Sequence, residues 1–334
     1  MTHASASPVP GPAPDSGLRT LAGIIRDVVE TIARDAVVIE ESGDRMDEEA
    51  APGPFGIAIA LADGQVITGG AATTGFAIQS ISKLFALDMA LRAHGDDLFK
   101  RVGREPSGDP FNSIIDLERT DGIPRNPFVN AGALVVVDTL IESMADDFQT
   151  RAVAEEVRSR AGLETVEIDE ALLVEERETG DLNRALMSFM RHHGNLHGDP
   201  VDVMEAYIHQ CSIRLDCRGL ARAGLPFTRT RRHPEDEQAD ATARRRRKVL
   251  ALMMTCGHYD GSGDFALRVG IPAKSGVAGG ILAIVPETAA IAVWSPNLDQ
   301  HGNSMLGVRA LEMVCDQTGW SVFGPPMALG TEPT

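Results

Sequence analysis

The sequence lacks the features that mark several large classes of protein. No apolar run approaches the ~20 residues that a membrane-spanning helix needs. Positive charge is scarce relative to negative charge, and a formal net charge of −17 argues against a nucleic-acid partner. None of the four cysteines forms a Cys-x-x-Cys pair, so we expect reduced, buried thiols at Cys211, Cys217, Cys256 and Cys315.

The N-terminus also lacks the basic region and apolar core of a signal peptide. Prolines at every second position from Pro8 to Pro14 predict a disordered tail over residues 1–17, and we expect a cytoplasmic protein. The composition, 43% apolar and 24% charged over 334 residues, is enough for one large domain or two of ordinary size.

The stretch from Phe76 to Lys83 carries the first chemical signal. Apolar residues follow Ser80 at helical spacing, and Lys83 lies three residues after Ser80, on the same face of the predicted helix. A serine hydroxyl needs a neighbouring base to act as a nucleophile, and a buried lysine can be that base. Ser-x-x-Lys is the nucleophile motif of class A β-lactamases and penicillin-binding proteins, which also carry a later Lys-Thr-Gly.

A second motif supports the first. Lys274-Ser275-Gly276 has the form of the Lys-Thr-Gly element and lies between two strand-like runs, 269–271 and 281–285. Two such motifs in the expected order favour an acyl-transfer enzyme with a serine nucleophile.

Periodicity and turn residues predict the order of the elements. We expect a helix over 18–36, a hairpin over 55–68, helices over 81–94, 131–144, 151–161, 183–191, 201–213 and 243–254, strands over 266–273, 280–285 and 289–294, and a last helix over 304–318. This order predicts an α+β fold, with one five-stranded antiparallel sheet packed by the terminal helices and a separate helical domain. The predicted boundaries are 18–75 and 262–320 for the sheet domain, 76–261 for the helical domain, and a second tail over 321–334.

Several longer motifs identify a resemblance. They are Gln79-Ser80-Ile81-Ser82-Lys83, Gly103 to Gly108, Asn126 to Ala133, Glu176 to Asp181, Gln210 to Ile213, Cys256 to Asp260, and Lys274 to Gly280. Together they resemble the serine-dependent glutaminases, which have a β-lactamase-like fold, over roughly residues 56–319.

The resemblance implies a role for each matching residue. Ser80 is the implied nucleophile, Lys83 its activating partner and Tyr259 a further catalytic group. The implied substrate contacts are Ser80, Asn130, Glu176, Asn183, Tyr207, Tyr259 and the main chain at Val277, with Lys274, Ser275 and Gly276 in support. The implied substrate is L-glutamine, and the implied assembly is a homo-oligomer, a dimer or tetramer. We predict no cofactor and no metal.

Most of these residues also have a purely structural interpretation. Asn130 and Asn183 could cap the helices that they open, Glu176 could belong to a solvated ion-pair network, and Tyr207 could be a core residue. Tyr207 and Tyr259 are the only tyrosines in the chain, and both fall on motif positions, which favours function.

Three other features have competing interpretations. Ser82 is a rival nucleophile, although Ser80 has the three-residue spacing to Lys83. The basic run 244–248 follows several acidic residues and is interpreted as a solvated helix face. His192, His193 and His197 are interpreted as a surface cluster rather than a metal site.

One position departs from the family pattern. The resemblance implies a substrate-binding tyrosine before the first strand, and no residue from Glu40 to Pro54 is a tyrosine. Two hypotheses therefore stand beside a glutaminase: a penicillin-recognising acylase or β-lactamase, and a non-catalytic amino-acid-binding protein. The intact Ser80 and Lys83 count against the second of these.

Overall fold

The fold is built on a five-stranded antiparallel sheet. The computed structural model describes residues 19–42, 45–46, 49, 51–108, 112–144, 150–325, 327 and 330. The strands lie in the order β2-β1-β8-β7-β6, and each neighbouring pair is antiparallel. Their bounds are β1 Gly56–Leu61, β2 Val66–Gly70, β6 Ala273–Ser275, β7 Gly280–Val285 and β8 Ala289–Trp294. The predicted fold class and sheet are confirmed.

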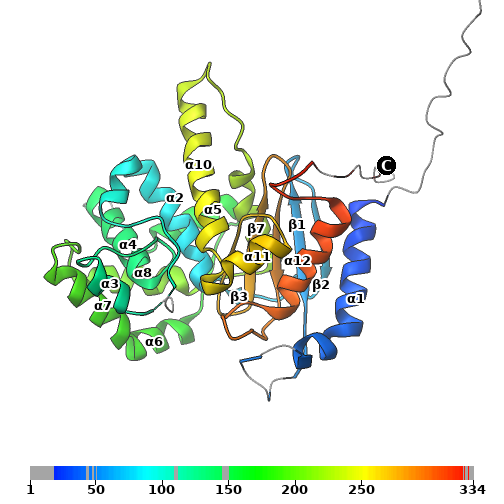
Figure 1. The fold of residues 1–334 in the computed structure, drawn as a ribbon, viewed down its shortest axis with the longest axis horizontal. Coiled ribbons are helices and arrows are strands. Elements are labelled where there is room, and N and C mark those ends of the chain that lie inside the picture. The colour runs from blue at the N-terminus through cyan, green and yellow to red at the C-terminus, as the bar shows by residue number, and fades with distance from the viewer. Residues whose placement is uncertain are drawn as a thin grey trace, which may run out of the picture.

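Both faces of this sheet are buried, and alternate side chains of a strand point into two different apolar cores. Ile57 and Ile59 of β1 join one apolar core, and Ala58 and Ala60 join the other, as the two-residue period of a strand requires. The first core also contains side chains from α1 (Leu21–Ser42), α11 (Ser262–Arg268) and α12 (Met305–Thr318). Figure 1 shows α1 and α12 on one side of the sheet and the helical part on the other.

The helical part lies between β2 and β6 in the sequence. Its helices are α2 Ser82–His94, α3 Ile115–Arg119, α4 Asn130–Met144, α5 Ala152–Ala161, α6 Glu170–Thr179, α7 Asp181–His192, α8 Pro200–Cys211, α9 Cys217–Gly224 and α10 Glu237–Cys256. A small sheet joins them in the order β3-β5-β4, with bounds β3 Phe76–Ala77, β4 Glu167–Ile168 and β5 Ile213–Leu215. Every residue of α2 from Ser82 to Leu91 is buried, so this helix is surrounded on all sides.

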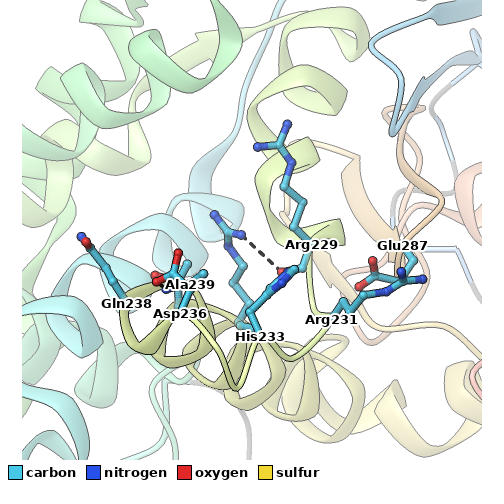
Figure 2. Close-up of a pocket in the computed structure, with 10 residues that line it drawn as sticks. Arg229, Arg231, His233, Asp236, Gln238, Ala239 and Glu287 are labelled. Carbon is cyan, nitrogen blue, oxygen red and sulfur yellow. Dashed lines mark hydrogen bonds between the residues drawn. The ribbon is translucent and has the colours of Figure 1, made fainter.

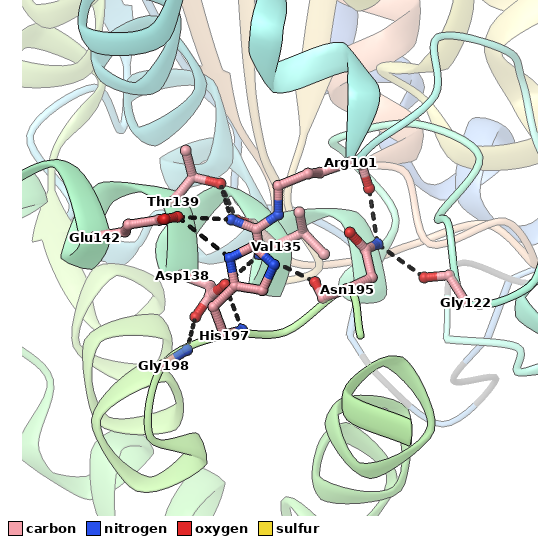
Figure 3. A network of polar contacts seen from close by, with 9 residues as sticks. All are labelled: Arg101, Gly122, Val135, Asp138, Thr139, Glu142, Asn195, His197 and Gly198. Carbon is pink, nitrogen blue, oxygen red and sulfur yellow. Dashed lines mark hydrogen bonds and ion pairs between the residues drawn. The ribbon is translucent and has the colours of Figure 1, made fainter. Parts of the chain in front are cut away.

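A buried ion pair ties α4 to two loops of the helical part (Figure 3). Asp138 of α4 has a fully buried side chain and pairs with Arg101. Its carboxylate also accepts main-chain N–H bonds from His197 (3.1 Å) and Gly198 (2.7 Å). Asn195 donates to the main-chain oxygen of Arg101 (2.8 Å), and this bond joins the loop of Arg101 to the loop of His197 and Gly198.

The predicted strand over 266–273 is wrong. Residues up to Arg268 belong to helix α11, and the strand starts only at Ala273. The buried side chains Phe265 and Val269 are four residues apart, whereas Leu267 between them is 85% exposed. That is helical spacing, and the apolar run only resembled a strand.

Two further predictions need correction. The first helix runs to Ser42 rather than Ala36, and the predicted start at residue 18 lies outside the described residues. In the basic run, Arg245 is not solvated, because it pairs at 2.7 Å with Asp88, whose side chain is 2% exposed. Arg244 is half exposed and pairs at 3.2 Å with Asp240, whose side chain is 5% exposed.

The described chain contains no helix that is long and apolar enough to cross a membrane. The four cysteines are free and buried, as expected. The predicted tail over 1–17 lies outside the described residues. Within the second predicted tail, Val322 donates its main-chain N–H to the carbonyl of Gly270 (2.9 Å).

Candidate active site

Ser80 lies where β3 leads into α2. A short 3-10 turn over Gln79–Ile81 precedes the helix, and Gln79 has a left-handed φ of 40°, which side chains rarely adopt. The Ser80 side chain is 7% exposed, whereas the rival Ser82 is fully buried. The strained backbone before Ser80 indicates that surrounding packing fixes its position.

Lys83 lies one helical turn after Ser80 and is 1% exposed. Its ammonium donates to the main-chain oxygen of Phe128 (3.2 Å) and to Oδ1 of Asn130 (2.7 Å). Burial lowers the pKa of Lys83 from 10.5 to about 8, against the smaller opposing effects of Cys211 and Glu176. No hydrogen bond joins Lys83 to Ser80 among the described contacts.

Asn130 brings three predicted residues together. Its Oδ1 accepts from Lys83 and from the Tyr207 hydroxyl (3.2 Å), and its Nδ2 donates to Oδ1 of Asn183 (3.1 Å). Asn183 does not cap its helix, which already begins at Asp181. Tyr207 is buried in α8, so it is a core residue whose hydroxyl also reaches the polar cluster.

The Tyr259 side chain contacts Ser80. The phenol hydrogen-bonds the Ser80 side chain and lies 3.5 Å from the main-chain oxygen of Ser275. Burial raises the pKa of Tyr259 to about 12, so the phenol is protonated at neutral pH. Its backbone has a φ of 53°, another left-handed value at a residue other than glycine.

The Lys274-Ser275-Gly276 motif packs against the Tyr259 ring. The Lys274 ammonium is 4.4 Å from the centre of the Tyr259 ring and donates to the main-chain oxygens of Gly257 (3.1 Å) and Ser275 (2.6 Å). Burial, followed by the charge of Lys83, holds the pKa of Lys274 well below its usual value. These contacts join the strand β6 to the Tyr259 turn.

Gly276 and Val277 bring the same strand end to Ser80. A Cβ atom at Gly276 would lie 2.8 Å from the main-chain oxygen of Ile78, so only glycine permits this approach. Val277 lies in the turn that Gly276 and Gly279 close with a 2.9 Å main-chain bond, and it is 36% exposed.

Glu176 is the predicted acidic contact. It lies on α6, is half-buried, and feels the charge of Lys83. Burial, followed by repulsion from Glu175, raises the pKa of Glu176. The described ion pair on this helix joins Arg177 to Glu205 (2.7 Å) and does not include Glu176.

Two neighbours of these residues were not predicted as part of the site. The thiol of Cys211 is buried, and burial raises its pKa to about 11 against the smaller opposing effect of the Lys83 charge. Asn303 contacts Ser275 and the residue before Tyr259. Cys211 lies within a quoted motif, but nothing in the local sequence around Asn303 signals its place.

The large surface pocket in Figure 2 lies elsewhere. It has a volume of about 550 Å³ and is lined by residues of the loop before α10, of α10 itself and of the β7–β8 turn, including Arg229, Arg231, His233 and Glu287. None of the predicted site residues lines it. Within the described chain, no group of three or more His, Cys, Asp or Glu side chains could hold a metal ion.

Comparison with known proteins identifies the family. The glutaminase family model matches residues 47–323. The chain belongs to the glutaminase family. The curated glutaminase of Azorhizobium caulinodans is 50% identical over 305 residues, which cover 90% of this chain and 98% of that protein. The thermolabile glutaminase of Rhizobium etli is 51% identical over 274 residues, 82% of this chain and 88% of that one.

Solved glutaminase structures share the fold. A Bacillus glutaminase matches with a TM-score of 0.75 at 31% identity, covering 91% of this chain and 98% of that one. A Bacillus subtilis glutaminase, solved as a covalent complex with 5-oxo-L-norleucine, matches with a TM-score of 0.73 at 26% identity over 90% and 99% of the two chains. The resemblance predicted from the motifs is confirmed.

Proposed function

We propose that this chain hydrolyses L-glutamine to L-glutamate and ammonia through an acyl-enzyme on Ser80. The proposal is carried by one observation: Ser80 contacts the Tyr259 phenol and lies one helical turn before a buried lysine whose pKa is lowered to about 8. Family membership supports an amidohydrolase over a β-lactamase or a protein that only binds amino acids.

The proposed reaction has two steps. The neutral Lys83 amine takes the Ser80 proton as Oγ attacks the carboxamide carbon. The protonated Tyr259 phenol then donates a proton to the departing nitrogen as the C–N bond breaks and ammonia leaves. The Lys83 ammonium returns its proton to the Tyr259 phenolate, and water hydrolyses the ester to L-glutamate and the free Ser80 hydroxyl. Main-chain N–H groups at Ser80 and Val277 would hold the oxyanion, at roughly 3–4 kcal/mol per donor.

The proposed substrate contacts follow from charge. Glu176 suits the α-ammonium of glutamine, and the amides of Asn130 and Asn183 can each accept and donate. The buried Tyr207 hydroxyl, already bonded to Asn130, would hold that amide in place.

Ser80→Ala tests the proposal. We expect it to abolish ammonia release from glutamine without changing the thermal melting midpoint by more than a few degrees. Asparagine and a chromogenic β-lactam, assayed beside glutamine, separate a glutaminase from the other acyl-transfer enzymes. An electrophilic glutamine analogue should add its mass to Ser80, and labelling of Ser82 instead would overturn the assignment.

We also propose a cytoplasmic homo-oligomer, a dimer or tetramer. Free, buried cysteines are consistent with a reducing compartment, and the assembly is what the family resemblance implies. Sedimentation equilibrium of the purified chain would give the number of subunits directly, and a monomer at micromolar concentration would contradict it.

A further inference from the structure

Asn303 lies in the loop between β8 and α12 and is 3% exposed. Its Oδ1 accepts a hydrogen bond from the Ser275 hydroxyl (2.7 Å) and lies 3.1 Å from Nδ1 of His258. Its Nδ2 faces the main-chain oxygen of His258 at 3.4 Å. One buried amide therefore joins the strand β6, the turn before Tyr259 and the β8–α12 loop.

Both partners of Asn303 adjoin Tyr259. His258 precedes it in the chain, and the carbonyl of Ser275 faces its phenol at 3.5 Å. The turn itself is closed by Ser262, whose hydroxyl accepts from the His258 N–H (3.0 Å) and donates to the Tyr259 carbonyl (2.7 Å). A tyrosine with a φ of 53° persists only where such contacts outweigh its strain.

His258 is held as a neutral, oriented ring. It stacks on Phe265, with ring centres 3.7 Å apart and an angle of 11° between planes. Burial, followed by the charge of Lys274, lowers the pKa of His258 to about 3. Because Oδ1 of Asn303 is an acceptor, the proton of the neutral ring is placed on Nδ1, and the imidazole donates.

The same loop also passes close to the Tyr259 ring at Gly302. A Cβ atom at Gly302 would lie 3.4 Å from Cγ1 of Val277 and 3.7 Å from Cε2 of Tyr259. The loop itself is braced, because the Asn303 N–H donates to Oδ1 of Asp299 (2.9 Å). A change in the side chain at 303 would therefore act on a loop that itself lies close to the Tyr259 ring.

We propose that Asn303 is a positioning residue, which fixes the Tyr259 phenol against Ser80 by accepting hydrogen bonds from Ser275 and His258 together. The inference rests on the proposed function, in which Tyr259 acts on the group attached to Ser80. It assigns Asn303 no contact with substrate. Its effect belongs to the chemical step, because a misplacement of about 1 Å can lower turnover by about 100-fold.

Two substitutions at this position test the proposal. Asn303→Leu keeps the approximate volume but removes the acceptor, so we expect kcat to fall by about 100-fold with KM nearly unchanged. Asn303→Asp keeps an acceptor for both donors and should restore kcat to within about tenfold of the parent.

Asn297→Leu is the matched control. Asn297 lies in the same loop, is 5% exposed, and donates to Glu40 (2.9 Å) and to the Ala51 carbonyl (2.8 Å) rather than contacting Ser275 or His258. We expect this change to lower the melting temperature without a comparable fall in kcat. Equal kcat losses in the leucine variants at 297 and 303 would overturn the proposal, because general loosening of the loop would then explain both.

A spectroscopic measurement reports the position of the phenol directly. The chain has two tyrosines, so Tyr207→Phe leaves Tyr259 as the single ring signal in protein grown with isotope-labelled tyrosine. Asn303→Leu should change the NMR chemical shift of the Tyr259 ring, and Asn303→Asp should return it toward the value with asparagine at 303. An unmoved signal with parent-like kcat in Asn303→Leu would overturn the inference. If an electrophilic glutamine analogue fails to label Ser80 in the parent, the proposed function fails instead.

Discussion

Lys83 is a buried amine whose hydrogen bonds, within the part of the chain that the structure describes, are made to neutral oxygens. It bonds the carbonyl of Phe128 and the amide of Asn130, and the nearest carboxylate effect, from Glu176, is outweighed by burial. A lysine whose pKa is about 8 is partly neutral near neutral pH, whereas an exposed lysine almost never is. Burial at this one residue therefore supplies the base that a serine hydroxyl requires.

Lys83→Arg should damage activity nearly as much as Lys83→Ala. Arginine keeps the positive charge but does not release its proton at working pH, so it cannot accept the proton of Ser80. Steady-state ammonia release from glutamine measures the effect. Near-normal turnover in Lys83→Arg would mean that the lysine serves only as a fixed charge.

The pH dependence of kcat/KM should follow the loss of the proton from Lys83. The active form of Lys83 is neutral, so kcat/KM should rise tenfold per pH unit below the pKa of Lys83, about 8, and level off above it. The Tyr259 phenol, with a pKa of about 12, should remain protonated over this range. Profiles of kcat/KM in overlapping buffers would check this, and a flat rate across the pKa of Lys83 would contradict it.

At the scale of elements, long and uniformly buried segments were the ones that the sequence predicted best. β7 and β8 were predicted with their observed bounds, because six consecutive apolar residues between turns fit a central strand. The sheet β3-β5-β4 was missed, since its strands are two or three residues long and carry no period. The last three residues of helix α11 were predicted as the start of a strand for the related reason that seven residues are too few to separate the two periods.

The Arg101–Asp138 contact should contribute strongly to the stability of the helical part. Asp138→Ala would leave two main-chain N–H groups without their acceptor and the largely buried Arg101 guanidinium with the half-exposed Glu142 in place of a buried carboxylate, so we expect a loss of about 3–5 kcal/mol in the free energy of unfolding. Asp181→Ala is the control, because that carboxylate is 91% exposed and its ion pair with Arg184 lies on the surface.

Chemical denaturation at neutral pH measures both variants. We expect Asp181→Ala to cost less than about 1 kcal/mol. Similar losses of unfolding free energy in the two variants would show that the buried pair at Asp138 stabilises the fold no more than the exposed pair at Asp181.

At the scale of the whole molecule, the candidate site is assembled from segments far apart in the sequence. Ser80 and Lys83 come from the helical part, and Lys274 and Ser275 from the sheet, and motif order predicted that they would meet. Asn303 was not predicted, because its part in the site comes only from the loop that places it between β6 and the Tyr259 turn. Contacts of that kind follow from tertiary packing and leave no local pattern.

The segment between α1 and β1 also contacts the part of the chain around the candidate site. Met46 donates its main-chain N–H to the Leu298 carbonyl (2.9 Å), and Gln300 donates to the carbonyl of Arg45 (3.2 Å). The segment thus packs on the loop that carries Gly302 and Asn303, beside Val277 and Tyr259. The family resemblance places a substrate-binding tyrosine in this segment, and none is present here.

We therefore predict a raised KM for glutamine, with kcat less affected. A lost hydrogen bond to a charged substrate group costs roughly 1.5–3 kcal/mol, or about one to two decades in affinity. Such a contact serves the ground state and the transition state alike, so its loss acts on KM. Acidic residues of the segment are poor substitutes near the substrate carboxylate, because like charges repel; of these, Asp44, Asp47 and Glu48 lie outside the described residues, and Glu49 is exposed.

The measurement is steady-state kinetics on glutamine beside a family member that has the tyrosine, under one buffer and at one protein concentration. Removing the tyrosine from that relative is the matched control, and it should raise its KM toward the value of this chain. If this chain and the unaltered relative have equal KM values, another group has taken over the contact of the missing tyrosine. Diluting the enzyme then separates the sources: a KM that rises on dilution assigns that group to a neighbouring subunit, and a constant KM assigns it to this chain.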